Sequence, residues 1–375
     1  MRPSLARLLA LALLSVAVMP GCRGGGDEGA APPSGASDGG AMAAEWRWEA
    51  PPRASVGMPA SDGPDVAFTY GHRYLALYGA DGTPRWALER IGLRDVAPRL
   101  TTDLVLAATD DGVVAVDRAG GQERWHTGLG ERANTPVMAG GRAVVSTWEG
   151  SLVALEVAGG RVAWRATLPG PAVGPATGAV DGPGGDVVVV TWESEHGDAA
   201  GAVAVDAATG RRRWAVALEP GGVSAPVVTA GGTVVVVAGD VAAHGLRLST
   251  GERRWRVETG GAGSPEAPPL VAADGGVLVA SRLGEMALVD EGDGRVRWQA
   301  SADAAVVRGG PAGPGPRGRF ALPLDDGRLL VAGPGGGQEI LDPPGRVSGV
   351  TVAGGLLLVA TRGAEVNALV ALHGW

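Results

Sequence analysis

Two tryptophan–glutamate pairs provide the side chains of this chain best suited to holding another molecule. Thr147-Trp148-Glu149 and Thr191-Trp192-Glu193 share one pattern, and the second pair is followed by an insertion, residues 194–201. Tryptophan is enriched among the residues that anchor protein interfaces. We therefore predict six partner-binding residues: Trp148, Glu149, Trp192, Glu193, Glu195 and His196. The alternative is that both indole rings fold down onto their own sheets as additional core.

Catalytic chemistry has much less support in the sequence. The five histidines show no paired spacing that would suggest a metal site. Neither a Gly-x-Ser-x-Gly elbow nor a phosphate-binding loop occurs. The carboxylate pairs Asp110-Asp111 and Asp325-Asp326, each followed by glycine, fit turns between strands better than calcium loops. We expect a protein that is not an enzyme, with no catalytic residue and no bound metal.

The first residues have the pattern of an export signal. Arg2 and Arg7 precede an apolar stretch, residues 8–19, that is too short to span a bilayer comfortably. Cys22, the only cysteine, follows this stretch directly and resembles the lipobox cysteine of bacterial lipoproteins. The resemblance implies removal of residues 1–21, lipidation of Cys22, and anchoring to a bacterial membrane outside the cytoplasm, the outer membrane where there is one. The alternative is an ordinary signal peptide followed by a stray thiol.

Composition and charge narrow the class of partner. Residues 22–44 are rich in Gly, Ala, Pro and Ser and predict a flexible linker, with a folded domain over residues 45–375. The formal net charge is −8, and it becomes −10 once the two arginines of residues 1–21 are removed. An acidic surface argues against nucleic acid and against adhesion to anionic headgroups. With one cysteine, no intramolecular disulfide can form, so stability must come from packing.

A repeat with a period near 40 residues must position all of these side chains. Six times a tryptophan follows a glycine by four residues: Gly82/Trp86, Gly121/Trp125, Gly160/Trp164, Gly210/Trp214, Gly251/Trp255 and Gly294/Trp298. Each unit also contains short apolar runs bounded by glycine, such as Ala225–Thr229 and Thr233–Ala238, which are typical of antiparallel strands. Four strands in about 41 residues predict a blade of an all-β propeller.

In four of the six units the third strand ends with an acid, and Tyr78 and Arg247 take that place in the other two. Asp117, Glu156, Asp206 and Asp290 each precede the repeat glycine by four residues. An acceptor at this place can bind backbone N–H groups of the turn, and glycine supplies the positive φ that the turn needs. The combined pattern, x-Ala-Leu/Val-Asp-x3-Gly-x3-Trp, resembles the PQQ-like, or quinoprotein-type, propeller repeat. That resemblance implies a structural role for the six glycine–tryptophan pairs, in which each tryptophan docks one blade on its neighbour.

Enzymes with this repeat bind pyrroloquinoline quinone and calcium in the central funnel. The resemblance implies adjacent cysteines and a Glu, Asn and Asp calcium site in such enzymes. The domain over residues 45–375 has no cysteine, and its only asparagines are Asn134 and Asn367. We therefore expect no cofactor, although quinone binding stays open as a less favoured alternative.

Counting the blades takes two further inferences. Gly336 and Ile340 keep the repeat spacing and predict a seventh unit with isoleucine in place of tryptophan. Residues 347–352, 356–360 and 367–372 supply three more strands, and residues 45–49 resemble residues 85–89, the tryptophan-bearing strand of the first unit. An eight-bladed ring, closed by pairing the N-terminal strand with the C-terminal blade, accounts for every segment and removes the exposed sheet edge. Seven blades with an irregular remainder is the alternative.

In a propeller, the turns between second and third strands share one face with the connections between blades. Around the ring this face is predicted to present Tyr70, His72, Asp110, Asp111, Trp148, Glu149, Trp192, Glu193, Asp240, Arg282, Asp325, Asp326 and Arg362. We expect an acidic sector anchored by tryptophans over blades 2 to 5.

The same features are shared by the propeller lipoprotein of the outer-membrane β-barrel assembly complex. This resemblance implies a monomeric, lipid-anchored scaffold that binds envelope proteins, including barrel-assembly machinery. An extracytoplasmic sensor or small-ligand-binding propeller is the alternative, and a quinone-dependent dehydrogenase is the less favoured one.

Overall fold

The structure is a computed structural model. It describes residues 44–180, 185–239, 242–258, 268–272, 274–281, 283–306, 313, 315, 318–343, 345–363 and 367–373. Within these ranges the chain forms strands and turns, and no helix there is long and apolar enough to cross a membrane. Cys22, the predicted signal peptide, nearly all of the predicted linker, Asp240, Arg282 and Trp375 lie outside the described residues.

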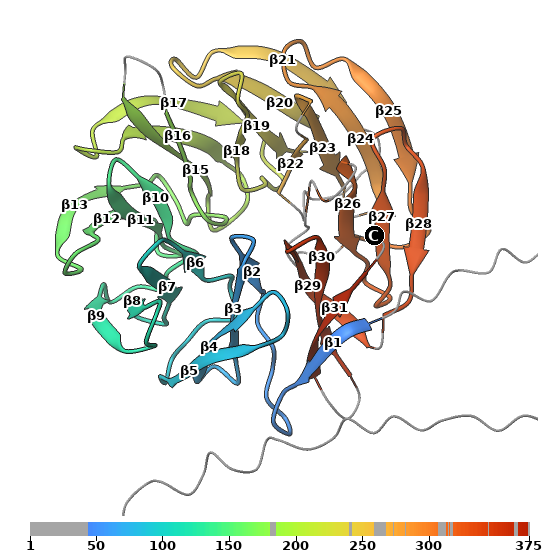
Figure 1. Cartoon of the computed structure of the whole chain (residues 1–375). Coiled ribbons are helices and arrows are strands. Elements are labelled where there is room, and N and C mark those ends of the chain that lie inside the picture. The colour runs from blue at the N-terminus through green and yellow to red at the C-terminus, as the bar shows by residue number, and fades with distance from the viewer. Residues whose placement is uncertain are drawn as a thin grey trace, which may run out of the picture. The chain divides into compact units, whose positions relative to one another are not determined.

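Eight antiparallel sheets follow one another around a ring (Figure 1), which confirms the eight-bladed propeller. Blade 1 contains β2 (Ala60–Ser61), β3 (Asp65–Tyr70), β4 (Tyr74–Gly79) and β5 (Pro84–Glu89). Blade 2 contains β6 (Arg99–Leu100), β7 (Leu104–Ala108), β8 (Gly112–Asp117) and β9 (Glu123–Gly128). Blade 3 contains β10 (Val137–Ala139), β11 (Arg142–Ser146), β12 (Ser151–Glu156) and β13 (Val162–Thr167). Blade 4 contains β14 (Thr177–Val180), β15 (Asp186–Glu193), β16 (Ala200–Asp206) and β17 (Arg212–Leu218).

The second half of the ring repeats the same order. Blade 5 contains β18 (Val227–Val228), β19 (Thr233–Ala238), β20 (Ala242–Arg247) and β21 (Arg253–Glu258). Blade 6 contains β22 (Leu270–Val271), β23 (Gly276–Ala280), β24 (Glu285–Asp290) and β25 (Val296–Ser301). Blade 7 shows three strands among the described residues, β26 (Phe320–Pro323), β27 (Leu329–Ala332) and β28 (Gln338–Leu341). Blade 8 contains β29 (Arg346–Ala353), β30 (Leu356–Arg362), β31 (Asn367–Leu372) and, at its outer edge, β1 (Ala44–Glu49).

The ring is closed by strands from opposite ends of the propeller, as the sequence predicts. β1 pairs antiparallel with β31, with Trp46 opposite Ala371 and Trp48 opposite Leu369. Figure 1 shows this pair where the blue and the red ends of the chain lie side by side. Because each other outer strand belongs to its own repeat, blade 8 is the one blade shared between the two ends.

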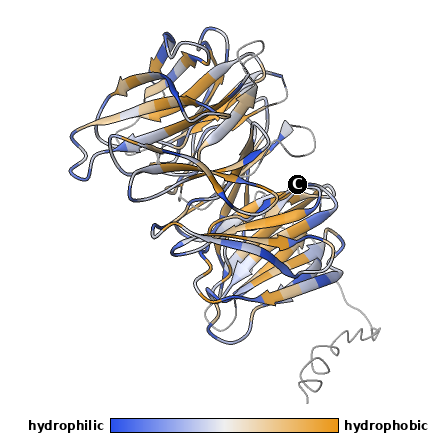
Figure 2. Ribbon diagram, turned by 90° about the vertical axis from the view of Figure 1, so that its left-hand side faces the viewer, coloured by the Kyte–Doolittle hydropathy of each residue, from blue (hydrophilic) through white to orange (hydrophobic). Residues whose placement is uncertain are grey.

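The core consists of apolar layers between neighbouring blades. Val187 and Val189 of β15, for example, share one buried cluster with Val234 and Val236 of β19. All six residues of β19 are buried, whereas the outer strand β13 alternates between half-buried and exposed positions. Figure 2 shows the corresponding pattern, with apolar residues concentrated on the strands and hydrophilic ones at many of the turns. A strand buried on both faces needs a continuous apolar run, which explains the valine-rich segments.

Each docking tryptophan lies against the repeat glycine of the following blade. The indole Nε1–H of Trp86 donates to the carbonyl of Arg118 at 2.7 Å, and its ring packs on Gly121. The same contact is made by Trp46, Trp125, Trp164, Trp214, Trp255 and Trp298, which donate to Ala80, Val157, Ala207, Leu248, Glu291 and Pro334. Gly121 has a φ of 72°, and a Cβ there would lie 2.7 Å from the Trp86 ring. This position therefore requires glycine for its backbone and for its space.

Where an acid precedes the repeat glycine by four residues, it organises the turn. Asp117 Oδ1 accepts from the N–H of Gly120 at 2.7 Å, and Asp206 Oδ1 accepts from Thr209 at 2.9 Å. The hydrogen bonds from Arg124 and from Gly120 hold the pKa of Asp117 below its ordinary value. These turns explain why the third-strand motif ends on an acceptor.

An aromatic cluster reinforces the closing junction. Trp48 of β1 lies 4.9 Å from Phe68, 5.0 Å from Tyr70 and 6.4 Å from Tyr78, between ring centroids. Tyr74 stacks on Tyr70 at 4.8 Å. Burial, with smaller contributions from Tyr78 and Tyr74, raises the pKa of Tyr70 to about 12. All three tyrosines of the chain therefore lie at the junction between blades 8 and 1.

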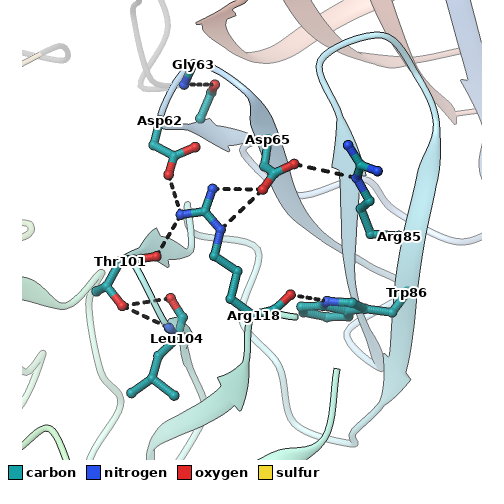
Figure 3. Close-up of polar contacts among 9 residues, drawn as sticks. Asp62, Gly63, Asp65, Arg85, Trp86, Thr101, Leu104 and Arg118 are labelled. Carbon is teal, nitrogen blue, oxygen red and sulfur yellow. Dashed lines mark hydrogen bonds and ion pairs between the residues drawn. The ribbon is translucent and has the colours of Figure 1, made fainter. Parts of the chain in front are cut away.

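A charged cluster joins blades 1 and 2 at the turns that follow their first and third strands (Figure 3). Arg118 donates to Asp65 and to the carbonyl of Thr101, each at 2.7 Å, and also pairs with Asp62. Burial lowers the pKa of Arg118, but the hydrogen bonds from Arg118 to the two aspartates outweigh burial and raise it. A cavity of about 890 Å³ borders this cluster, and most of its charged lining residues are paired: Asp65 with Arg118 and Arg85, and Asp117 with Arg124. We infer that these charges stabilise the junction between blades 1 and 2.

A candidate protein-binding face around Trp148

The turns after the second strands and the connections between blades lie on one face, which we call the funnel face. Isolated backbone bridges join Leu93 to Thr109 and Ala133 to Thr147, which places each connection beside the turn of the next blade. The structure thereby brings the described residues predicted for this face onto one side of the ring: Tyr70, His72, Asp110, Asp111, Trp148, Glu149, Trp192, Glu193, Asp325, Asp326 and Arg362.

Trp148 is an exposed ring in a fixed orientation. Its side chain follows β11 in the turn of blade 3 and is 44% exposed. Its Nε1–H donates to Asn134 Oδ1 at 2.9 Å. The guanidinium carbons of Arg94 and Arg132 lie 4.7 and 4.9 Å from the ring centroid, within the range of cation–π attraction. The ring is therefore held in place although nearly half of its surface meets solvent.

Asn134 is the buried support of this arrangement. Its Nδ2 donates to Ser146 Oγ at 3.2 Å and to the carbonyl of Gly174 at 3.1 Å. Because Gly174 belongs to the connection into blade 4, the amide joins two blades as well as the ring. Sequence analysis missed Asn134, Arg94 and Arg132 as part of the site. The rarity of asparagine in the folded domain was the available signal for Asn134. Its contact with Gly174, in the connection into blade 4, could not be seen in the local sequence.

Trp192 has a different environment from Trp148. It lies on β15 opposite Gly201 of β16, and it is half-buried. A Cβ at Gly201 would lie 2.9 Å from its Nε1, and one at Gly170 would lie 3.1 Å from its Cε3. The ring thus covers two glycines and joins the apolar layer between blades 3 and 4. Of the two alternatives that the sequence leaves open, Trp192 has the geometry of a core residue.

Trp148 and the insertion of blade 4 enclose a pocket of about 240 Å³. Its walls are Trp148, Pro171, Ala172, Val173, Glu193, Ser194 and Glu195. Hydrogen bonds from Asp198 and Ala199 N–H to Ser194 Oγ order the loop that carries Glu195. The structure therefore brings together Trp148, Glu193 and Glu195 of the six predicted residues. Glu149 is paired with Arg132 at 2.8 Å, and exposed His196 is not among the walls.

A second cavity, of about 420 Å³, also has Trp148 in its wall, and we call it the central cavity. Its lining comes from blades 1 to 6: Met58, Val96, Ala97, Asn134, Thr135, Trp148, Val173, Gly174, Pro175, Val223, Ser224, Ala225 and Pro268. The lining is largely apolar and contains no charged side chain among the described residues. Trp148 and Val173 line both cavities, so the two spaces adjoin at the indole ring.

The acidic sector expected over blades 2 to 5 is largely paired with bases. Asp110 lies 3.6 Å from Arg94, Asp111 lies 3.2 Å from His126, and Glu131 lies 2.5 Å from Arg165. Burial raises the pKa of Asp111, but hydrogen bonds from Thr109 and His126 outweigh it, and the net shift is downward. By contrast, the carboxylates of Glu193 and Glu195 have no hydrogen-bond or ion-pair partner among the described residues.

Three large exposed apolar side chains lie on elements of the funnel face. Among the described residues, the large hydrophobic side chains with high exposure are Ile91, Leu283, Trp148 and Val162, at 77%, 55%, 44% and 39%. Ile91 lies in the connection between blades 1 and 2, and Leu283 lies in the turn between β23 and β24. Three of the four therefore belong to the funnel face, whereas Val162 lies on the outer strand β13.

Sequence comparison shows the family of the chain. Three overlapping segments, residues 40–135, 109–214 and 175–313, match the family model described as outer membrane protein assembly factor BamB. The chain belongs to the BamB family. No curated protein sequence matches it.

Solved structures show how widely this fold occurs beyond the BamB family. The chain is similar to the crystal structure of BamB from Moraxella catarrhalis, with 17% identity, a TM-score of 0.67, and coverage of 88% of this chain and 100% of that one. Saccharomyces cerevisiae Sqt1 has 13% identity and a TM-score of 0.66, and the computationally designed Ika8 protein has 14% and 0.65. In both cases the match covers 85% of this chain and 96% of the other. At these identities the likeness shows the fold alone.

The described lining of the central cavity does not fit a quinone and calcium. A quinone with several carboxylates needs cationic partners, and calcium needs several oxygen ligands, usually carboxylates among them. The described lining of the central cavity offers no charged group, and the amide of Asn134 is already bound by Trp148, Ser146 and Gly174. Among the described residues, no group of three or more His, Cys, Asp or Glu side chains could hold a metal ion.

Proposed function

We propose that this chain is a non-catalytic, lipid-anchored scaffold of the cell envelope that binds proteins through its funnel face during outer-membrane protein assembly. Membership of the BamB family supports the assembly role. The observation that carries the binding face is the exposure of Trp148, Ile91 and Leu283 on one side of the ring. Trp148 is the strongest support for a binding face, because its hydrogen bond to Asn134 orients the ring before a partner binds.

The non-catalytic part of the proposal is supported by the lining of the central cavity. In quinone-dependent propellers the reaction takes place in the funnel, and here the described lining has no acid, base or charged anchor. Adding quinone and calcium to the purified protein is expected to give neither a shifted quinone absorbance nor dye-linked alcohol oxidation. Either signal would contradict this part of the proposal.

The binding face is tested by photo-crosslinking in the source bacterium. A photoreactive phenylalanine analogue replaces Ile91 or Leu283 on the funnel face, or Val162 on the outer strand as the control. We expect the first two positions to crosslink to a component of the barrel-assembly machinery, identified by mass spectrometry, and Val162 to give little product. Equal crosslinking from all three positions, or none to the assembly machinery, would contradict the proposal.

The lipid anchor is tested separately at Cys22, which lies outside the described residues. Cys22→Ser is expected to abolish labelling with radioactive palmitate and to release the protein from the membrane fraction. Continued sedimentation of an unlabelled protein with the membrane would show that another attachment holds it.

A further inference from the structure

We propose that the two cavities beside Trp148 form one site for a peptide segment in which a large apolar side chain is adjacent to a lysine or arginine. The apolar side chain enters the central cavity, and the cation binds Glu193 and Glu195. The inference rests on the proposed function in one respect, namely that the funnel face binds a protein.

The cavities adjoin at a shared wall. Trp148 and Val173 line the central space of about 420 Å³ and the acidic pocket of about 240 Å³. The central volume falls within the range of about 300–1,000 Å³ that is typical of ligand pockets. An apolar side chain and a cationic side chain on adjacent residues of one peptide could therefore enter the central cavity and the acidic pocket at the same time.

The central cavity favours an apolar occupant. Its described lining has Met58, Val96, Val223 and Pro268 around it and no charged side chain. The polar lining side chains are already bound within the protein: Asn134 as described, Thr135, which donates to the carbonyl of Ala97 at 2.8 Å, and Ser224, which donates to the carbonyl of Ala225 at 3.1 Å. Burying a charge or an unpaired polar group there would carry a desolvation cost that an aliphatic or aromatic side chain avoids.

The adjoining pocket favours a cation. Other carboxylates around Trp148 are paired, Glu149 with Arg132 and Asp110 with Arg94, whereas Glu193 and Glu195 have no described partner. Arg94 and Arg132 lie on the Trp148 ring, and their charges are opposed by Asp110 and Glu149. A lysine or arginine in the pocket would form charge-assisted hydrogen bonds with the free carboxylates.

The surroundings favour a peptide over a free small cation. Ile91 and Leu283, from the first connection and from blade 6, are exposed on the same face but line neither cavity. A ligand confined to the two cavities would leave both side chains in water. A polypeptide partner is large enough to cover them as well.

The test measures binding of short fluorescent peptides to the purified full chain by anisotropy. The probes are acetylated and amidated Gly-Gly-Leu-Arg-Gly-Gly, the same peptide with Arg replaced by Gln or by Glu, and the same peptide with Leu replaced by Gly. The protein variants are the double variant Glu193→Gln with Glu195→Gln, and the control Glu252→Gln. Glu252 is an exposed carboxylate on the opposite face, in the turn between β20 and β21. Circular dichroism checks that each variant is folded.

We expect the Leu-Arg peptide to bind best, and each peptide change to weaken it. The double variant should weaken the Leu-Arg peptide about tenfold, the size of one charge-assisted hydrogen bond, and leave the Leu-Gln peptide unchanged. Glu252→Gln should bind like the unmodified chain. Equal binding of the Leu-Glu peptide, or of the Leu-Arg peptide to the double variant, would overturn the inference. So would phenethylammonium binding as tightly as the peptide, since it would indicate a small-ligand site.

The peptide-binding test and the crosslinking test of the proposed function can fail independently of each other. If no peptide binds while position 91 still crosslinks to the assembly machinery, the peptide site is wrong and the scaffold proposal stands. If the peptides bind as expected but no assembly protein is crosslinked, the site stands and its partner belongs to another system.

Discussion

The indole N–H of Trp148 donates a hydrogen bond of 2.9 Å to Asn134 Oδ1, so a buried amide fixes an exposed ring. The same amide donates to Ser146 and to Gly174 and thereby joins blade 3 to the connection into blade 4. Asn134 therefore supports both the junction between the blades and the orientation of the ring.

Substitution at these two positions should separate binding from stability. Trp148→Ala is expected to change the free energy of unfolding by less than about 1 kcal/mol, as for other exposed positions. It should weaken partner binding by about 2 kcal/mol or more, as for an interface anchor. Asn134→Ala should destabilise the fold by about 1–3 kcal/mol, because Ser146 and Gly174 lose a buried partner. Urea unfolding and crosslink yield measure the two quantities. A large stability loss in Trp148→Ala with binding intact would make the ring a core residue.

The docking contacts can be tested with two glycines of similar backbone conformation. Gly121 and Gly130 have φ values of 72° and 70°, but a Cβ at Gly121 would meet the Trp86 ring, and one at Gly130 has nothing within 4 Å. Gly130→Ala should therefore cost about 1–2 kcal/mol, from the left-handed backbone alone. Gly121→Ala should cost a further ~1–3 kcal/mol from overpacking. Equal losses in urea unfolding would show that the Trp86 contact is unimportant.

The charged cluster of Figure 3 should be worth more than an ion pair at the surface. Arg118 has a side-chain exposure of 15% and binds two aspartates, whereas Arg161 is 74% exposed and pairs with Glu156 alone. Arg118→Met is expected to destabilise the protein by about 2–4 kcal/mol, because Asp62 loses its partner and Asp65 keeps only Arg85, 3.7 Å away. Arg161→Met should cost less than ~1 kcal/mol. Thermal unfolding of both variants at low and high salt compares them. A smaller loss for Arg118→Met than for Arg161→Met would be inconsistent with this role.

His244 is expected to make the fold sensitive to mild acid. The ring is fully buried in β20, 2.9 Å from Glu219. Burial lowers its pKa below 6.5, aided by Arg253 and Arg256 and opposed by Glu219. The unfolded chain therefore binds a proton more readily than the native one, so the free energy of unfolding should fall as the pH drops below about 6.5. His244→Leu should lose this part of the dependence. Urea unfolding between pH 7.5 and 5 measures the slope, and an unchanged slope in the variant would exclude His244 as its source.

Much of the architecture could be predicted from the sequence, because the repeat is a local pattern. Gly82 and Trp86, or Gly294 and Trp298, lie four residues apart and occupy the same turn and strand in each blade. The closing strand could also be inferred, because the residues around Trp46 in the sequence resemble those around Trp86.

The site was less predictable, because its members come from different blades. Thr147-Trp148-Glu149 and Thr191-Trp192-Glu193 are alike in sequence, yet β11 ends before Trp148 whereas β15 continues through Trp192. Gly170 and Gly201 then provide space for the ring of Trp192. Arg94, which lies against Trp148, is 54 residues away in the chain. No local pattern could show that the ring of Trp148 rests on these groups.

The location of the tyrosines has a kinetic consequence. β1 and β31 pair residues such as Trp46 and Ala371, so ring closure is the contact of greatest sequence separation and is expected to form late in folding. Tyr70, Tyr74 and Tyr78 lie at that junction, and the chain has no other tyrosine. In a stopped-flow refolding experiment, tyrosine absorbance should change more slowly than far-ultraviolet circular dichroism, which follows the individual blades. Simultaneous changes would show that closure and blade formation are one step. If the tyrosine change is the slower one, the three tyrosines report the time at which the two ends of the propeller meet.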